Sequence, residues 1–186
     1  VMYRDFEQSL ENHKLLGTTN MGIGGFWFDT ADEVKEFIDK ANVVAEKAGK
    51  NGMKFTYHNH SHEFIRLENG KTAMEMLMEG LDSKNTTFVL DTYWVQHGGG
   101  DPRQWIEKLA GRVDILHLKD MRRIKADHDV QQITEIGSGN MNWDGIIESA
   151  EKSGVKYYVV EQDANWNPNC FAAIKKSADY LKKYMG

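Results

Sequence analysis

Hydrophobic and polar residues alternate along the chain with two different periods, and segments of the two kinds follow each other in turn. In residues 30–52 the apolar positions recur every three or four residues behind a Thr30 and Glu33 capping pair, which predicts an amphipathic helix. The run TTFVLD at 86–91 is short and apolar, as is typical of a buried strand. The same reasoning predicts helices at 3–16, 30–52, 72–81, 102–111, 142–154 and 168–185. It predicts strands at 18–24, 53–58, 86–91, 113–120 and 155–162, with a short strand at 133–136.

The order of these elements indicates a parallel sheet. From residue 54 to residue 114 each predicted strand is separated from the next by a helix, which is the arrangement of βαβ units. No low-complexity linker divides the 186 residues, so we expect one domain over 1–186. The pattern alone leaves a barrel and an open sheet as alternatives.

Composition narrows the classes of protein. Apolar residues make up 40% of the chain and charged residues 27%, which favours a packed core. The net charge is −5 with no basic run, so nucleic acid is not an expected partner. Cys170 is the single cysteine, which excludes an internal disulfide and a thiolate zinc site. No apolar run approaches the ~20 residues of a membrane span and no signal peptide is evident, so we expect a cytoplasmic protein.

Polar side chains that can bind a metal stand at the ends of the predicted strands. Asp91 ends one strand, His117 and Lys119 lie near the end of another, and Glu161 closes a third. Because the carboxyl ends of parallel strands line one rim, these side chains are expected to converge. Carboxylates with an imidazole and no thiolate favour Mn²⁺ or Mg²⁺, with Co²⁺ and Zn²⁺ as alternatives. Taken singly, Asp91 could instead cap a helix and His117 could be a hydrogen-bonded core residue.

Three histidines crowd the segment FTYHNHSHEF at 55–64. If the strand extends to residue 60, His58 and His60 share one face, and His62 joins them if it extends further. Substrate contact or acid–base work, metal ligation and a structural role all remain open for these histidines. HEFIR at 62–66 is not a zinc-protease motif, because Arg66 replaces its second histidine.

Aromatic residues also follow the strand ends. Tyr93, Trp94 and Trp166 could stack on the C–H faces of a sugar or simply pack against the rim. Lys119 lies two residues after His117 and would share its face, within reach of a substrate oxygen or a carboxylate ligand. HGGG at 97–100 has no accompanying nucleophile elbow, so we interpret it as a flexible loop at the rim.

Five motifs in order resemble the sugar phosphate isomerase/epimerase family of xylose-isomerase-like barrels: TYHNHSHEF, FVLDTYWVQHGGGDP, GRVDILHLKD, EIGSGNMNWDGII and YYVVEQD. The resemblance runs from about residue 13 to the C-terminus. It implies a (β/α)8 TIM barrel of about 250 residues, here truncated at the N-terminus to about five or six βα units. It also implies one divalent ion held by Asp91, His117 and Glu161, with Glu63 as the first ligand and His60 or His58 as its substitute.

The family resemblance implies a metal-dependent sugar isomerase or epimerase that works through an enediolate intermediate. The catalytic candidates are Glu161, Glu63, His60 and His58, and the candidate substrate contacts are Lys119, Trp94, His62 and Trp166. A keto-sugar dehydratase or keto-glycoside lyase would use the same metal site, and an inactive sugar-binding fragment is the non-catalytic alternative. The acidic balance argues against an endonuclease, which is the activity of more distant barrel relatives.

A partial barrel leaves sheet edges open. The edges predicted here are 18–24 and 155–162, and unpaired edges are sites of association. We therefore expect these strands to pair with another copy or with residues outside this chain, in a homo-oligomer or with a missing N-terminal segment.

Overall fold

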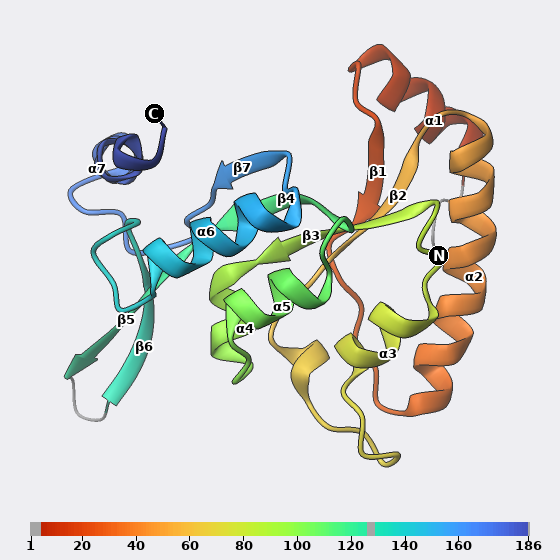
Figure 1. Ribbon diagram of the computed structural model, residues 1–186, viewed down its shortest axis with the longest axis horizontal. Helices are drawn as coiled ribbons and strands as arrows, with labels where there is room; N and C mark the ends of the chain where they lie inside the picture. The colour runs from red at the N-terminus through yellow and green to blue at the C-terminus, as the bar shows by residue number, and fades with distance from the viewer. Residues whose placement is uncertain (1–4, 126–128, 186) are drawn as a thin grey trace. The chain divides into compact units, whose positions relative to one another are not determined.

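The computed structural model describes residues 5–125 and 129–185 (Figure 1). The chain folds as two compact units, Val1–Val89 and Leu90–Gly186. The prediction that 1–186 forms one domain stays a prediction. Among the described residues, no helix combines the length and the apolar character that crossing a membrane requires.

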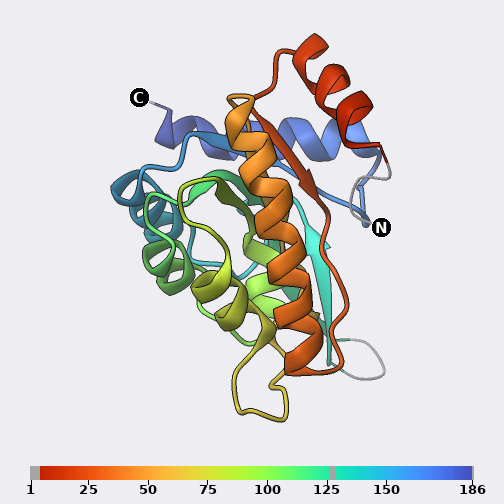
Figure 2. The ribbon, with the colours of Figure 1, turned by 90° about the vertical axis from the view of Figure 1, so that its right-hand side faces the viewer.

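The first unit is a parallel sheet covered by helices. Its helices are α1 (Phe6–Leu15), α2 (Ala31–Lys50) and α3 (Ala73–Gly80), and its strands are β1 (Asn20–Ile23), β2 (Lys54–His58) and β3 (Thr86–Asp91), which runs on into the second unit. β2 pairs in parallel with β1 on one side and with β3 on the other, where His58 lies opposite Val89. Figures 1 and 2 show α2 lying along β2.

Half of the capping box predicted at Thr30 and Glu33 is present in the structure, because the Glu33 carboxylate accepts from the Asp29 N–H at 2.8 Å and not from the Thr30 N–H. The Thr30 hydroxyl accepts a hydrogen bond from the Glu33 backbone N–H at 3.2 Å, which fixes the first turn of α2. All but one of the apolar positions predicted for one face are buried, and the exception is the half-buried Val44; the buried ones are Val34, Phe37, Ile38, Ala41, Ala45 and Ala48. Helix α2 therefore buries the side that its sequence period predicts.

The second unit combines parallel strands with an antiparallel hairpin. Its strands are β4 (Val113–Leu118), β5 (Asp120–Lys125), β6 (Asp129–Thr134) and β7 (Tyr157–Val160). Its helices are α4 (Thr92–His97), α5 (Pro102–Lys108), α6 (Trp143–Ser153) and α7 (Cys170–Leu181), followed by the short turn η2 (Lys182–Tyr184). β4 and β7 pair in parallel with His117 opposite Val159, α5 packs on α6, and the β5–β6 hairpin projects from the unit (Figure 1).

The strands predicted at 113–120 and 133–136 differ from the structure. The strand predicted at 113–120 ends at Leu118, and a new strand, β5, begins at Asp120. The short strand predicted at 133–136 is β6, which starts earlier and pairs with β5. Both hairpin strands are rich in charged and amide side chains, because a hairpin with one solvent face needs few apolar residues. The first two residues of the helix predicted at 3–16 lie outside the described residues.

A buried carboxylate closes the base of the hairpin. Asp120 has 0% exposure, and its Oδ2 accepts hydrogen bonds from Gly137 N at 2.8 Å, Gly139 N at 3.1 Å and Trp143 Nε1 at 2.8 Å. Its Oδ1 accepts from Met121 N at 2.7 Å. A Cβ at position 139 would lie 2.3 Å from that Oδ1, so only glycine fits there. Burial raises the pKa of Asp120 even though these donors oppose the shift.

Strand β7 is the outermost strand of the second unit. Within the described part of the chain it pairs only with β4, and it stands at the end of the strand order. Tyr157, Tyr158 and Val159 on β7 remain 57%, 39% and 43% exposed. An apolar strand with this exposure matches the predicted edge at 155–162, and its pairing with another copy or another segment stays a prediction.

Candidate metal centre

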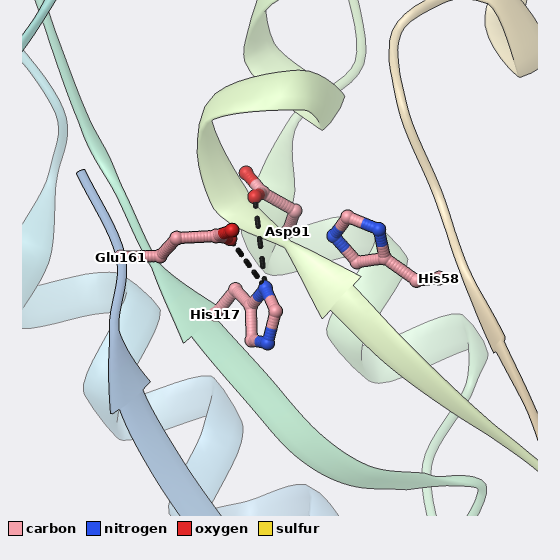
Figure 3. Close-up of side chains that lie close together, drawn as sticks. All are labelled: His58, Asp91, His117 and Glu161. Carbon is pink, nitrogen blue, oxygen red and sulfur yellow. Dashed lines mark ion pairs between the residues drawn. The ribbon is translucent and has the colours of Figure 1, made fainter. Parts of the chain in front are cut away.

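Three side chains of the second unit with metal-ligand chemistry come from three different strands. Asp91 is the last residue of β3, His117 is near the end of β4, and Glu161 directly follows β7. Their ligand atoms all lie within 4.8 Å of one another. Figure 3 shows the carboxylates of Asp91 and Glu161 turned toward the imidazole of His117. His117 Nδ1 is 2.6 Å from Glu161 Oε2 and 3.9 Å from Asp91 Oδ2.

Backbone hydrogen bonds set the positions of these side chains. The Thr92 hydroxyl lies 3.1 Å from the carbonyl oxygen of His117 and accepts from the Lys119 N–H at 3.1 Å, which ties the start of α4 to the end of β4. The Glu161 N–H donates to the carbonyl oxygen of Leu118 at 3.0 Å. Asp91 Oδ1 caps α4 by accepting from Trp94 N at 3.1 Å, as the capping alternative predicted. Its Oδ2 remains on the side of His117.

Lys119 places a buried ammonium against the same carboxylates. The side chain is 1% exposed, and its Nζ lies 3.0 Å from Asp91 Oδ2, 3.2 Å from Glu161 Oε2 and 2.9 Å from Asp163 Oδ2. The Nζ also lies 5.3 Å from the centre of the Trp94 ring. Burial lowers the pKa of Lys119, but the surrounding carboxylates, Asp91 first, outweigh burial and raise it above its ordinary value.

Glu161 is ionised at neutral pH. The hydrogen bond with His117 lowers the pKa of Glu161 to about 2, with a further contribution from the charge of Lys119. A metal ligand has to be deprotonated, so this carboxylate is ready to bind a cation over the whole physiological range.

The donor set and the charge both fit a divalent cation. Two carboxylate oxygens and one imidazole nitrogen form a mixed set without thiolate, which suits hard to borderline divalent ions. Three carboxylates meet one ammonium here, an excess of two negative charges around the buried Asp91 and Lys119, with Glu161 and Asp163 partly exposed. A bound divalent ion would balance this excess. Asp91, His117 and Glu161 are therefore the residues of this unit that would hold it.

The first unit holds a second group of histidines and a carboxylate. Its members are His60, His62 and Glu63 on the turn η1 (His62–Phe64) and just before it. Strand β2 ends at His58, so the expected alternation of three histidines along one strand face does not extend past that residue. Glu63 is fully buried and accepts from Tyr57 Oη at 2.7 Å and from His60 N at 2.8 Å. The prediction that Glu63, His60 or His58 supplies a first metal ligand stays a prediction.

Glu63 closes a ring of hydrogen bonds around the backbone N–H and carbonyl of Phe26. Tyr57 Oη accepts from Phe26 N at 3.0 Å and donates to Glu63 Oε1. His62 Nε2 lies 3.2 Å from the same Oε1 and 3.1 Å from Phe26 O. Both neighbours of this nitrogen are acceptors, so Nε2 carries the hydrogen. The ring holds the loop before α2, where the exposed indole of Trp27 stacks on His62 with ring centres 4.0 Å apart.

Sequence reasoning missed this ring for an identifiable reason. The segment GIGGFW at 22–27 fails the dinucleotide-binding pattern at its last position and carries no other local signal.

Burial, followed by the charge of Glu63, raises the pKa of Tyr57 well above its ordinary value, so the phenol remains a donor. Gly25 has φ +99°, and a Cβ there would lie 2.8 Å from His60 Nδ1.

Two further predicted substrate contacts, Trp94 and Trp166, belong to the second unit. Trp94 is partly buried beneath the Lys119 ammonium. Trp166 is 48% exposed in the loop after β7, and its indole N–H donates to the Gln162 carbonyl at 2.9 Å. Asp163 pairs with Lys119 and joins the network through its position two residues after Glu161, the spacing that keeps residues on one side of an extended chain.

Replacing Glu63 by glutamine is expected to lower the free energy of unfolding by about 1–3 kcal/mol. The new amide group turns an N–H toward the Tyr57 hydroxyl or the His60 N–H, both of which donate to the native carboxylate. Urea denaturation measures the change. Glu79→Gln is the matched control, because Glu79 is half exposed in a surface ion pair. An unchanged unfolding free energy in Glu63→Gln would show that the ring does not hold the loop.

Parallel strands alternating with helices, and ligand-type side chains at the carboxyl ends of those strands, define an α/β protein of the barrel or open-sheet type. The profile of the xylose isomerase-like TIM barrel family matches residues 3–184, and the chain belongs to that family. The predicted resemblance and fold class are thereby confirmed.

The solved and curated relatives carry the names of different activities. A sugar phosphate isomerase/epimerase from Parabacteroides distasonis superposes with a TM-score of 0.80 at 30% identity, over 95% of this chain and 61% of that one. The inosose dehydratase of Geobacillus thermodenitrificans is 26% identical over 174 residues, which are 84% of this chain and 56% of the dehydratase. That of Clostridium beijerinckii is 25% identical, over 96% of this chain and 64% of the dehydratase. The chain thus spans less than two thirds of the length of each.

Proposed function

We propose that this chain carries the metal centre of an enzyme that enolises an α-hydroxy ketone of a sugar or an inosose. The convergence of Asp91, His117 and Glu161 carries the proposal. The favoured outcome is isomerisation or epimerisation, as in the isomerase/epimerase relative at 30% identity. Mn²⁺ or Mg²⁺ is the favoured ion for this donor set.

The residues present supply the elements of such a reaction. A divalent cation, when bound, supplies positive charge beside the carbonyl and hydroxyl oxygens of the substrate. Glu161 is ionised and takes the proton from the carbon that bears the hydroxyl group, next to the carbonyl. The electron pair of the broken C–H bond forms the carbon–carbon double bond of the enediolate. Return of a proton to the opposite face gives the epimer, and return to the neighbouring carbon gives the isomer.

Dehydration is the second candidate, and the inosose dehydratases among the curated relatives favour it. The same enediolate would expel a hydroxyl group from the next carbon, and that oxygen leaves as water only if it receives a proton. The Lys119 ammonium lies 3.2 Å from Glu161 Oε2, so an N–H donor is already next to the proposed base.

Proton NMR in D2O tests the reaction. The purified protein with Mg²⁺ is incubated with a panel of keto-sugars and inososes. Isomerisation or epimerisation predicts deuterium at the carbon that receives the returning proton, in an inverted or isomeric product. Dehydration leaves the deprotonated carbon without hydrogen, so its marker is the unsaturated ketone or the diketone to which that product tautomerises. Absence of both exchange and new product across the panel, with the metal bound, would overturn both candidates and favour a sugar-binding protein.

The purified protein should bind about one divalent ion per chain in this centre. Binding of Mn²⁺ should raise its melting temperature, because the ion binds only the folded state. Asp91→Asn should weaken binding by 10-fold or more, since it removes a ligand charge. Elemental analysis and titration calorimetry measure these effects. Asp101→Asn is the control, because asparagine replaces aspartate well as the cap of α5. Equal affinity in Asp91→Asn and the wild type would rule out this centre.

A further inference from the structure

We propose that Lys119 is an internal cation of the metal centre, which neutralises Asp91 and Glu161 when no metal is bound and releases them to the metal while staying paired with Asp163. This inference rests on the proposed metal-binding function. It assigns Lys119 a competing role toward the ion in place of the substrate contact predicted from the sequence.

The ammonium and the ion need the same oxygen atoms. Lys119 Nζ lies 3.0 Å from Asp91 Oδ2 and 3.2 Å from Glu161 Oε2. His117 Nδ1 approaches these same two atoms, at 3.9 Å and 2.6 Å. An ion with ligand distances of about 2.0–2.3 Å would have to enter between the two oxygens and the imidazole. It would then stand a few ångströms from Nζ, where two positive charges repel.

Burial explains why Lys119 cannot simply turn into water. The side chain is 1% exposed, so its charge depends on partners inside the protein. Without the ammonium, the three carboxylates around it would repel one another. The lysine therefore stabilises the metal-free arrangement more than the metal-bound one.

Asp163 provides the place to which the ammonium withdraws. Its Oδ2 lies 2.9 Å from Nζ, it is outside the proposed ligand set, and its side chain is 48% exposed. The centre of the Trp94 ring lies 5.3 Å from Nζ and stabilises a cation there. A shift of the ammonium toward Asp163 therefore keeps Lys119 paired after the ion takes Asp91 and Glu161.

Because the ammonium and the ion compete for the same carboxylates, substitutions of Lys119 and of Asp163 should change the affinity for the ion in opposite directions. Removing Lys119 destabilises the metal-free protein most, so the apparent affinity for the ion rises. Removing the charge of Asp163 leaves the ammonium dependent on Asp91 and Glu161, so the apparent affinity for the ion falls. A lysine that only supports the fold would not produce this pair of effects.

Titration calorimetry with Mn²⁺ and thermal denaturation of the EDTA-treated protein test the proposal. We expect Lys119→Met to lower the melting temperature of the metal-free protein and to bind Mn²⁺ about 5-fold or more tightly. We expect Asp163→Asn to bind Mn²⁺ about 5-fold or more weakly. Lys156→Met is the matched control, because Lys156 pairs with Asp114 in the same unit at 2.9 Å and should leave Mn²⁺ affinity unchanged.

Three results would overturn the inference. Weaker or unchanged Mn²⁺ binding in Lys119→Met would show that the lysine organises the ligands or does not act on the ion. If Lys119→Met does not fold, unchanged or tighter Mn²⁺ binding in Asp163→Asn would overturn the inference in its place. If the wild type binds no Mn²⁺, the proposed metal centre fails and this inference fails with it, which separates that case from a failure confined to Lys119.

Discussion

Glu161→Gln is expected to lower turnover by about 10³-fold or more while leaving the fold unchanged. The glutamine has the same shape and keeps an oxygen that can face the His117 imidazole, now 2.6 Å from the carboxylate. It cannot accept the substrate proton, and it removes one negative charge from the ligand set. The native carboxylate has a pKa of about 2, so its base form is present at every pH at which the protein would be assayed.

The loss is measured as the kcat of the Glu161→Gln variant. Circular dichroism checks that the variant is folded. Asp179→Asn is the control. Asp179 also has a pKa of about 2, held there by Lys175 and Lys182, but it lies on the surface of α7. The Asp179→Asn variant should turn over substrate like the wild type. A kcat within a few-fold of the wild type in Glu161→Gln would end the proposed mechanism.

Asp120→Ala is expected to cost about 3–5 kcal/mol of unfolding free energy. The alanine leaves Gly137 N, Gly139 N and the Trp143 indole N–H without the acceptor they share. Asp120→Asn retains one oxygen and should cost less, about 1–3 kcal/mol, because its amide group faces the Met121 N–H.

Urea denaturation followed by tryptophan fluorescence measures both Asp120 variants. Asp144→Asn is the control, since the Asp144 carboxylate is 81% exposed and pairs with Lys183 on the surface. Its midpoint should not change. Equal midpoints for the alanine and asparagine variants of Asp120 would mean that the shared oxygen contributes nothing.

The sequence pattern was sufficient to predict those elements whose buried residues recur with the period of a strand or a helix. Strand β3 and helix α2 were predictable because a buried strand is a short apolar run and a covered helix repeats every three or four residues. Asp91 and Glu161 stood out because charged groups immediately after apolar runs of parallel strands fall at one rim. For these residues, position along the chain already implies position in space.

The β5–β6 hairpin and the end of β2 depend on contacts that no local sequence pattern encodes. The hairpin of β5 and β6 is polar, so its strands lack the apolar run that marks the others. The end of β2 at His58 follows from the turn that brings Glu63 beneath Tyr57. These partners are chosen by tertiary structure, and one sequence does not show which distant groups meet.

The hydrogen-bond ring around Phe26 has a consequence for how this chain can diverge. Tyr57, His62 and Glu63 each hold a donor or acceptor that another member needs. Loss of one member leaves buried polar groups unsatisfied, so replacements at these three positions should be inherited together or not at all. Phe26 enters the ring only through its peptide N–H and carbonyl. Its side chain packs against the rings of Phe28 and Phe37, so replacements there are limited by apolar packing and not by the hydrogen-bond ring.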